Sequence, residues 1–96
     1  MSKATEIYVL DRAVRLLQPA AGFRTSLDSV MLAASCPAAE GDHVLDMGCG
    51  VGGACFCVLH RVPGSRMTGV EIQADYAELA RQNIALNNAA ERAVIV

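Results

Sequence analysis

The stretch from Val44 to Gly53, VLDMGCGVGG, joins a short apolar run to a cluster of glycines. This order is typical of a buried strand that ends in a tight turn and continues into a helix. Gly48 allows a sharp turn without a Cβ clash, and Gly50 allows the backbone to lie close to a ligand. Because the first N–H groups of a helix have no partner within it, they would form a polar cradle beside the loop.

An acidic residue, Glu71, ends the next apolar segment about 20 residues beyond the glycines. A carboxylate at the tip of a neighbouring parallel strand can accept hydrogen bonds from both hydroxyls of a ribose. Ile72 follows Glu71 and is placed to pack on an adenine ring. Together with the glycine loop, these residues predict a site for a nucleoside-containing ligand.

Two ligand classes fit this pattern. Gly48, Gly50 and Gly53 satisfy the G-x-G-x-x-G spacing of dinucleotide-binding domains, so a nicotinamide- or flavin-binding oxidoreductase is one interpretation. Asp46 favours another, because its carboxylate precedes the glycines at the strand tip and would repel a pyrophosphate. It would instead attract the ammonium and sulfonium groups of S-adenosylmethionine. The residues therefore favour S-adenosylmethionine and leave the dinucleotide as the alternative.

Hydrophobic periodicity predicts the elements that position these residues. We expect a strand at 43–47, a helix over 53–61, a strand at 66–71, a helix over 73–88 and a strand from residue 93. This β-α-β-α-β order predicts an α/β fold, the N-terminal part of a Rossmann-like doubly wound parallel sheet.

The residues ahead of this unit predict a short strand and a helix. Residues 13–17 favour the strand and 27–36 the helix, with 1–5 as a loose terminus and 18–22 as a turn. The chain thus divides into an N-terminal strand, loop and helix segment, 1–40, that covers the cofactor site, and an incomplete S-adenosylmethionine-binding domain, 41–96.

Charge and cysteine spacing narrow the function classes. The 96 residues carry a formal net charge of −2, which does not predict a basic nucleic-acid-binding surface over the whole chain. Basic residues nevertheless outnumber acidic ones among the first 24, which suggests a local basic face there. The four cysteines lack metal-ligand spacing and are expected as small buried hydrophobes, so we predict no metal. We find neither a signal peptide nor an apolar run that could span a membrane, and expect a cytoplasmic protein.

Residues 44–53 resemble the first motif of class I S-adenosylmethionine-dependent methyltransferases, and residues 69–72 (GVEI) resemble their second-strand motif. The sequence from about residue 10 onward is similar to the bacterial tRNA1(Val) adenine-N6 methyltransferases and related small-domain methyltransferases. The similarity includes Gln18-Pro19 and residues 22–33. The resemblance implies S-adenosylmethionine as the cofactor and an amine, adenine N6 in tRNA, as the methyl acceptor. It also implies that a loop and helix close over the cofactor, with Phe23, Thr25 and Asp28 near its methionine portion.

The chain departs from this family in one respect. Amino-methyltransferases of this type carry an Asn-Pro-Pro-Tyr motif that orients the target amine, whereas the prolines here are Pro19, Pro37 and Pro63. We therefore expect an N-terminal fragment, inactive alone, in which no residue is assigned to catalysis. A truncated, non-catalytic interaction module that associates through an open sheet edge is a further alternative. The predicted cofactor-binding residues are Asp46, Gly48, Gly50, Glu71, Ile72, Thr25 and Asp28.

Overall fold

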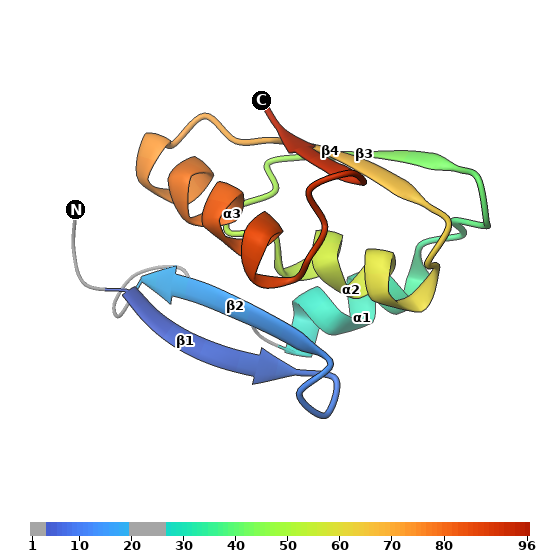
Figure 1. Ribbon diagram of the computed structural model, residues 1–96, viewed down its shortest axis with the longest axis horizontal. Helices are drawn as coiled ribbons and strands as arrows, with labels where there is room; N and C mark the ends of the chain where they lie inside the picture. Colours follow the sequence, from blue (N-terminus) through green and yellow to red (C-terminus); the bar gives the residue numbers. More distant parts are fainter. Residues whose placement is uncertain (1–3, 20–26) are drawn as a thin grey trace.

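The computed structural model describes residues 4–19 and 27–96, apart from the side chains of Leu27 and Asp28. A β-hairpin and a helix precede a unit in which strands and helices alternate (Figure 1). The elements in chain order are β1 (Ala4–Val9), β2 (Val14–Pro19), α1 (Leu27–Ser35), β3 (His43–Met47), α2 (Gly53–Arg61), β4 (Arg66–Val70), α3 (Ala74–Leu86) and β5 (Ala93–Ile95).

Strands β3, β4 and β5 form a parallel sheet in that order, so β4 is the central strand. Val44 of β3 pairs with Met67 of β4, and Thr68 of β4 pairs with Val94 of β5. Helices α2 and α3 connect consecutive strands, and this arrangement confirms the predicted Rossmann-like α/β fold. Within this strand–helix unit, the predicted and observed elements differ only at their ends; for example, β4 stops one residue short of Glu71.

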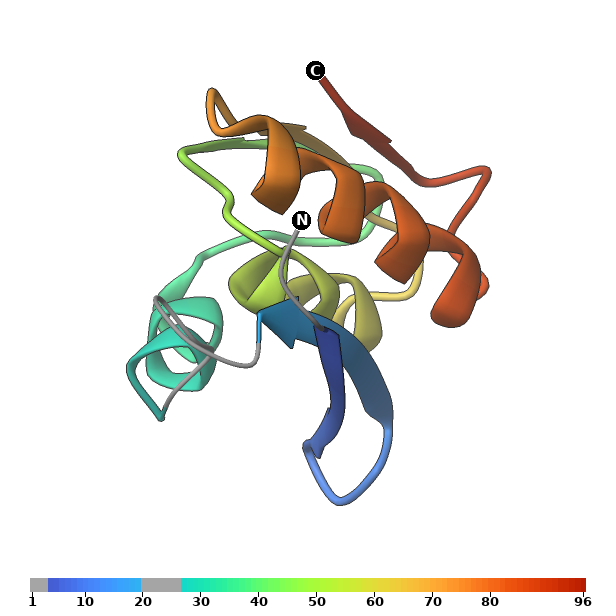
Figure 2. The same cartoon turned by 90° about the vertical axis from the view of Figure 1, so that its left-hand side faces the viewer.

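The sheet, the helices and the hairpin lie in successive layers (Figure 1). Helices α2 and α3 lie against one face of the sheet, and the β1–β2 hairpin packs on the far side of these helices (Figure 2). Leu16 of β2, Phe56 of α2 and Ala80 of α3 are buried in one common core. The hairpin therefore belongs to the same hydrophobic unit as the sheet.

None of the described residues covers the opposite face of the sheet. Side chains alternate along β3, so Val44 and Asp46 point toward the helices while Leu45 and Met47 point away. Leu45 is 61% exposed and Met47 is 71% exposed. The sheet thus has one packed face and one open apolar face.

The hairpin corrects two predictions about the first 20 residues. Ala4 and Thr5, expected in a loose terminus, begin β1, and Gln18 and Pro19, expected in a turn, end β2. β1 pairs antiparallel with β2 along its whole length, from Ala4 opposite Pro19 to Val9 opposite Val14. Because β1 is mostly exposed and carries little apolar alternation, the pairing with β2 rather than its own pattern defines it. The rest of the predicted turn, residues 20–22, lies outside the described residues.

Candidate functional site

The glycine loop leaves β3 and enters α2 in left-handed backbone conformations. The φ angles of Gly48, Gly50 and Gly52 are 77°, 60° and 96°, a region that side chains with a Cβ rarely adopt. A Cβ on Gly52 would also lie 2.8 Å from Cδ2 of Phe56, whereas a Cβ on Gly48 would meet nothing within 4 Å. Gly48 thus leaves open space over the loop, and Gly52 allows the loop to approach α2.

Backbone hydrogen bonds tie this loop to the end of the neighbouring strand. The N–H groups of Gly48 and Cys49 donate to the carbonyl oxygen of Val70, over 2.7 and 3.0 Å. The Glu71 carboxylate then accepts from two backbone N–H groups, that of Gly50 at Oε1 and that of Gln73 at Oε2, both over 2.8 Å. The structure therefore brings Glu71 and Gly50 into direct contact at the carboxyl edge of the sheet.

Asp46 lies at the same edge but on the helical side of the sheet. Its backbone pairs in register with Gly69, and its side chain points toward α2. Oδ2 accepts a hydrogen bond from the thiol of Cys55 over 3.1 Å. Asp46 and Glu71 thus end neighbouring strands, while their carboxylates contact different groups.

Two buried cysteines accompany these carboxylates. Cys49 and Cys55 are 8% and 1% exposed, as expected for small buried hydrophobes. The neighbouring Cys49 thiol raises the pKa of Cys55, and burial and the charge of Asp46 raise this pKa further. Cys55 is therefore a protonated donor to Asp46. Sequence reasoning missed this contact; the signal was the position of Cys55 in the first turn of the helix that the glycine loop opens.

Of the remaining predicted site residues, the structure describes only some. Ile72 lies beside Glu71 with 95% of its surface exposed, so nothing within the described residues packs on it. Thr25 and Phe23 lie outside the described residues, as does the side chain of Asp28, although its backbone belongs to α1. Coverage of the site by the N-terminal segment thus stays a prediction.

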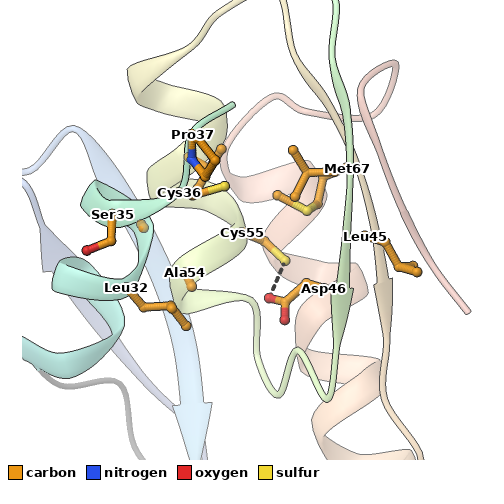
Figure 3. A pocket seen from close by; sticks show the side chains of 12 residues that line it. Leu32, Ser35, Cys36, Pro37, Leu45, Asp46, Ala54, Cys55 and Met67 are labelled. Carbon is orange, nitrogen blue, oxygen red and sulfur yellow. Dashed lines mark hydrogen bonds between the residues drawn. The ribbon is translucent and has the colours of Figure 1, made fainter. Parts of the chain in front are cut away.

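A cavity of about 340 Å³ opens between α1, β3 and α2, next to Asp46 (Figure 3). Its lining is mostly apolar, and Figure 3 shows Cys55 pointing toward Asp46 while Leu45 points away from both. The glycines of the loop and Glu71 do not line it. The cavity therefore lies beside the edge strand β3, separate from the contact between Gly50 and Glu71. Its lining residues are Leu32, Ala33, Ser35, Cys36, Pro37, Val44, Leu45, Asp46, Ala54, Cys55, Val58 and Met67.

A parallel sheet that carries a glycine loop at one strand end and a carboxylate at the next is the architecture of Rossmann-like domains. The family model described as Methyltransferase small domain matches residues 24–96, and the chain belongs to this family. The match includes α1 and the whole parallel sheet, but not the hairpin.

Similar proteins include two curated methyltransferases. Ribosomal RNA small subunit methyltransferase C of Aeromonas hydrophila is 43% identical over 61 residues, which are 64% of this chain and 18% of that protein. Trans-aconitate 2-methyltransferase of Paracidovorax citrulli is 36% identical over 53 residues, 55% of this chain and 20% of that protein. The chain therefore spans about a fifth of the length of these relatives.

A solved structure extends the likeness to the hairpin. The tRNA (uracil-54, C5)-methyltransferase of Pyrococcus abyssi, in complex with S-adenosyl-L-homocysteine, is 28% identical, with a TM-score of 0.73. That match covers 99% of this chain and 24% of the other. These relatives do not support the oxidoreductase alternative.

The described residues provide neither a metal site nor a membrane-spanning helix. Residues 4–19 and 27–96 contain no group of three or more His, Cys, Asp or Glu side chains arranged to hold a metal ion. Among their helices, none combines the length and the apolar character that a membrane span requires.

Proposed function

We propose that this chain binds S-adenosylmethionine and is the cofactor-binding part of a methyltransferase. The observation that carries the proposal is the 2.8 Å hydrogen bond from the Gly50 N–H to the Glu71 carboxylate. It joins the loop over which an adenosyl group would lie to the acid that would bind its ribose. The open space over Gly48 and the exposed Ile72 also suit a flat ligand that lies across this edge.

S-adenosylmethionine supplies an activated methyl group on its sulfonium, so the protein chiefly has to hold and orient it. Glu71 would accept hydrogen bonds from the ribose hydroxyls, and Ile72 would pack on the adenine. Asp46 would attract the positively charged methionine end, assisted by Thr25 and Asp28. The backbone at Gly48 and Gly50 would lie against the ligand without a side chain between them.

We further propose that the methyl acceptor is an amine of a nucleic acid, with adenine N6 in tRNA as the specific candidate. The support is the resemblance of residues 18–33 and 69–73 to adenine-N6 methyltransferases and the likeness to proteins named for rRNA and tRNA methylation. In the hairpin, the guanidinium of Arg12 lies 4.6 Å from the ring centre of Tyr8, a pairing that suits stacking on a base. The relative named for trans-aconitate represents the competing class, a small-molecule acceptor.

We also propose an activity, a location and an assembly for the 96-residue chain. Because its sequence holds no Asn-Pro-Pro-Tyr motif, we expect it to bind cofactor without transferring a methyl group. We place it in the cytoplasm, where its four cysteines stay as free thiols. No described strand pairs with the outer edge of β3, and we expect this edge to pair with a second copy of the chain.

Calorimetric titration with S-adenosylhomocysteine and with NAD tests the cofactor assignment. We expect the first to bind and NAD not to bind. Replacing Glu71 with alanine should weaken binding roughly 10- to 100-fold, because charge-assisted hydrogen bonds to the ribose are lost. The control is Glu78→Ala, which removes an exposed acid of α3 and should leave the affinity unchanged. Equal affinity of Glu71→Ala and the unmodified chain would remove Glu71 from the site, and preferential NAD binding would overturn the assignment.

A further inference from the structure

Asn83 of α3 is a polar residue with none of its surface exposed. The oxygen and both N–H groups of its side-chain amide make hydrogen bonds to other segments. Oδ1 accepts from the N–H of Leu17 over 2.6 Å, and Nδ2 donates to the carbonyl oxygens of Leu17 and Val51, each over 2.9 Å. One buried amide thus joins the connecting helix, the hairpin strand β2 and the glycine loop.

The bond to Val51 lies within the candidate cofactor site. Val51 is 1% exposed and lies between Gly50 and Gly52, both of which have positive φ angles. Glycines leave a loop with many accessible conformations, so a single loop geometry has to come from bonds to fixed neighbours. Glu71 binds this loop at the Gly50 N–H, and Asn83 binds it at the Val51 carbonyl. The loop is therefore held from two directions, by a strand end and by a helix.

Asn87, one helical turn after Asn83, binds the same strand, and its Nδ2 donates to the backbone carbonyl oxygen of Asn83 over 2.9 Å. Its Oδ1 accepts from the N–H of Arg15 over 2.9 Å, and its Nδ2 donates to the carbonyl oxygen of Arg15 over 2.6 Å. The two asparagines thus bind alternate residues of β2, Arg15 and Leu17, as the backbone of a neighbouring strand would. Asn87 binds the hairpin, and its side-chain bonds within the described residues do not reach the glycine loop.

We propose that Asn83 is a positioning residue of the cofactor site, which fixes the glycine loop through the Val51 carbonyl and couples it to the hairpin. This inference rests on the proposed function, because it concerns how the same loop is held ready for S-adenosylmethionine. A buried asparagine with a purely structural role would stabilise the fold without a separate effect on cofactor affinity.

The test compares Asn83→Ala with Asn87→Ala. Both variants lose bonds to β2. Asn87→Ala also loses the bond to the Asn83 backbone carbonyl, and only Asn83→Ala loses the bond to the glycine loop at Val51. Thermal unfolding should show that both are destabilised. Calorimetry with S-adenosylhomocysteine should show a loss of affinity of roughly 10-fold for Asn83→Ala and no more than about 2-fold for Asn87→Ala. Equal losses in the two variants would overturn the positioning role.

A measurement on the unmodified chain keeps the proposal open to refutation even if Asn83→Ala fails to fold. The side-chain amide protons of Asn83 and Asn87 can be followed by NMR during titration with S-adenosylhomocysteine. We expect those of Asn83 to shift and to exchange more slowly, and those of Asn87 to stay unchanged. Saturation with no change at Asn83 would overturn the positioning role alone, whereas failure of the unmodified chain to bind would overturn the proposed function as well.

Discussion

Asp46 and Cys55 form the most unusual contact at the candidate site. A thiol is a weak hydrogen-bond donor, yet Cys55 is held 3.1 Å from the Asp46 carboxylate by its place in the first turn of α2. Cys55 is 1% exposed, and the neighbouring Cys49 thiol, burial and the nearby charge of Asp46 all raise the pKa of Cys55. Ionisation of Cys55 is thus much harder in the folded chain than in the unfolded one.

This difference predicts a loss of stability at alkaline pH. An unperturbed cysteine has a pKa of 9.0. Above this pH the unfolded chain releases the Cys55 proton, while the folded chain keeps it. The contribution of Cys55 to the free energy of unfolding is complete below pH 9.0 and decreases as the pH rises further, by about 1.4 kcal/mol per unit. Urea unfolding across this range should show a flatter decline for Cys55→Ser, whose hydroxyl does not titrate. Parallel profiles for the two proteins would contradict the prediction.

At the scale of the element, the turn from β3 into α2 depends on two different properties of glycine. Gly48 needs only a left-handed backbone, because its surroundings are open. Gly52 needs the same kind of backbone and also the absence of a Cβ, because the buried ring of Phe56 packs directly against it. Alanine substitution at Gly48 therefore tests the backbone conformation alone, whereas alanine substitution at Gly52 tests the conformation and the packing together.

We expect Gly52→Ala to destabilise the chain more than Gly48→Ala. Each alanine in a left-handed conformation costs roughly 1–2 kcal/mol. Gly52→Ala adds an overlap with Phe56 that costs roughly 1–3 kcal/mol more, because a core ring has little room to move. Chemical denaturation of both variants measures the difference, and Gly48→Ala serves as the matched control. Equal destabilisation would show that the Phe56 contact is not restrictive.

At the scale of the whole molecule, the described helices cover only one face of the sheet. β3 is an edge strand of the described sheet, and the face away from α2 and α3 exposes Leu45, Met47 and Val94. An unpaired strand edge next to an apolar face favours pairing with another chain. The curated relatives are about five times as long as the stretches they share with this chain, so most of their residues lie outside the part that matches.

We therefore expect the isolated chain to self-associate. Sedimentation velocity should show a larger species as the concentration rises, and Leu45→Lys should weaken this association by placing a charge on the open face. Met31→Lys is the control, because Met31 is similarly apolar and 58% exposed but lies on α1 and not on the open face of the sheet. A monomer at every concentration would contradict the prediction, and equal effects of both variants would assign the association to another surface.

Local patterns were enough to predict the strand–helix–strand–helix–strand unit. Apolar runs, helical periodicity and the glycine cluster lie within consecutive residues, so β3, α2, β4 and α3 were expected close to where they are found. The parallel pairing then had to bring Asp46 and Glu71 to one edge, because both residues lie at the carboxyl ends of neighbouring strands. The positions of the loop and of its partner acid could thus be predicted from the sequence.

The contacts that hold this site were decided by the tertiary structure. β1 is a strand because β2 pairs with it, Asn83 reaches residues 17 and 51 across the core, and Cys55 reaches Asp46 only after α2 packs on the sheet. In each of these contacts, the local sequence around one group does not indicate which distant group it will meet. Periodicity reports which face of an element is buried, and only the packed molecule determines which groups meet there.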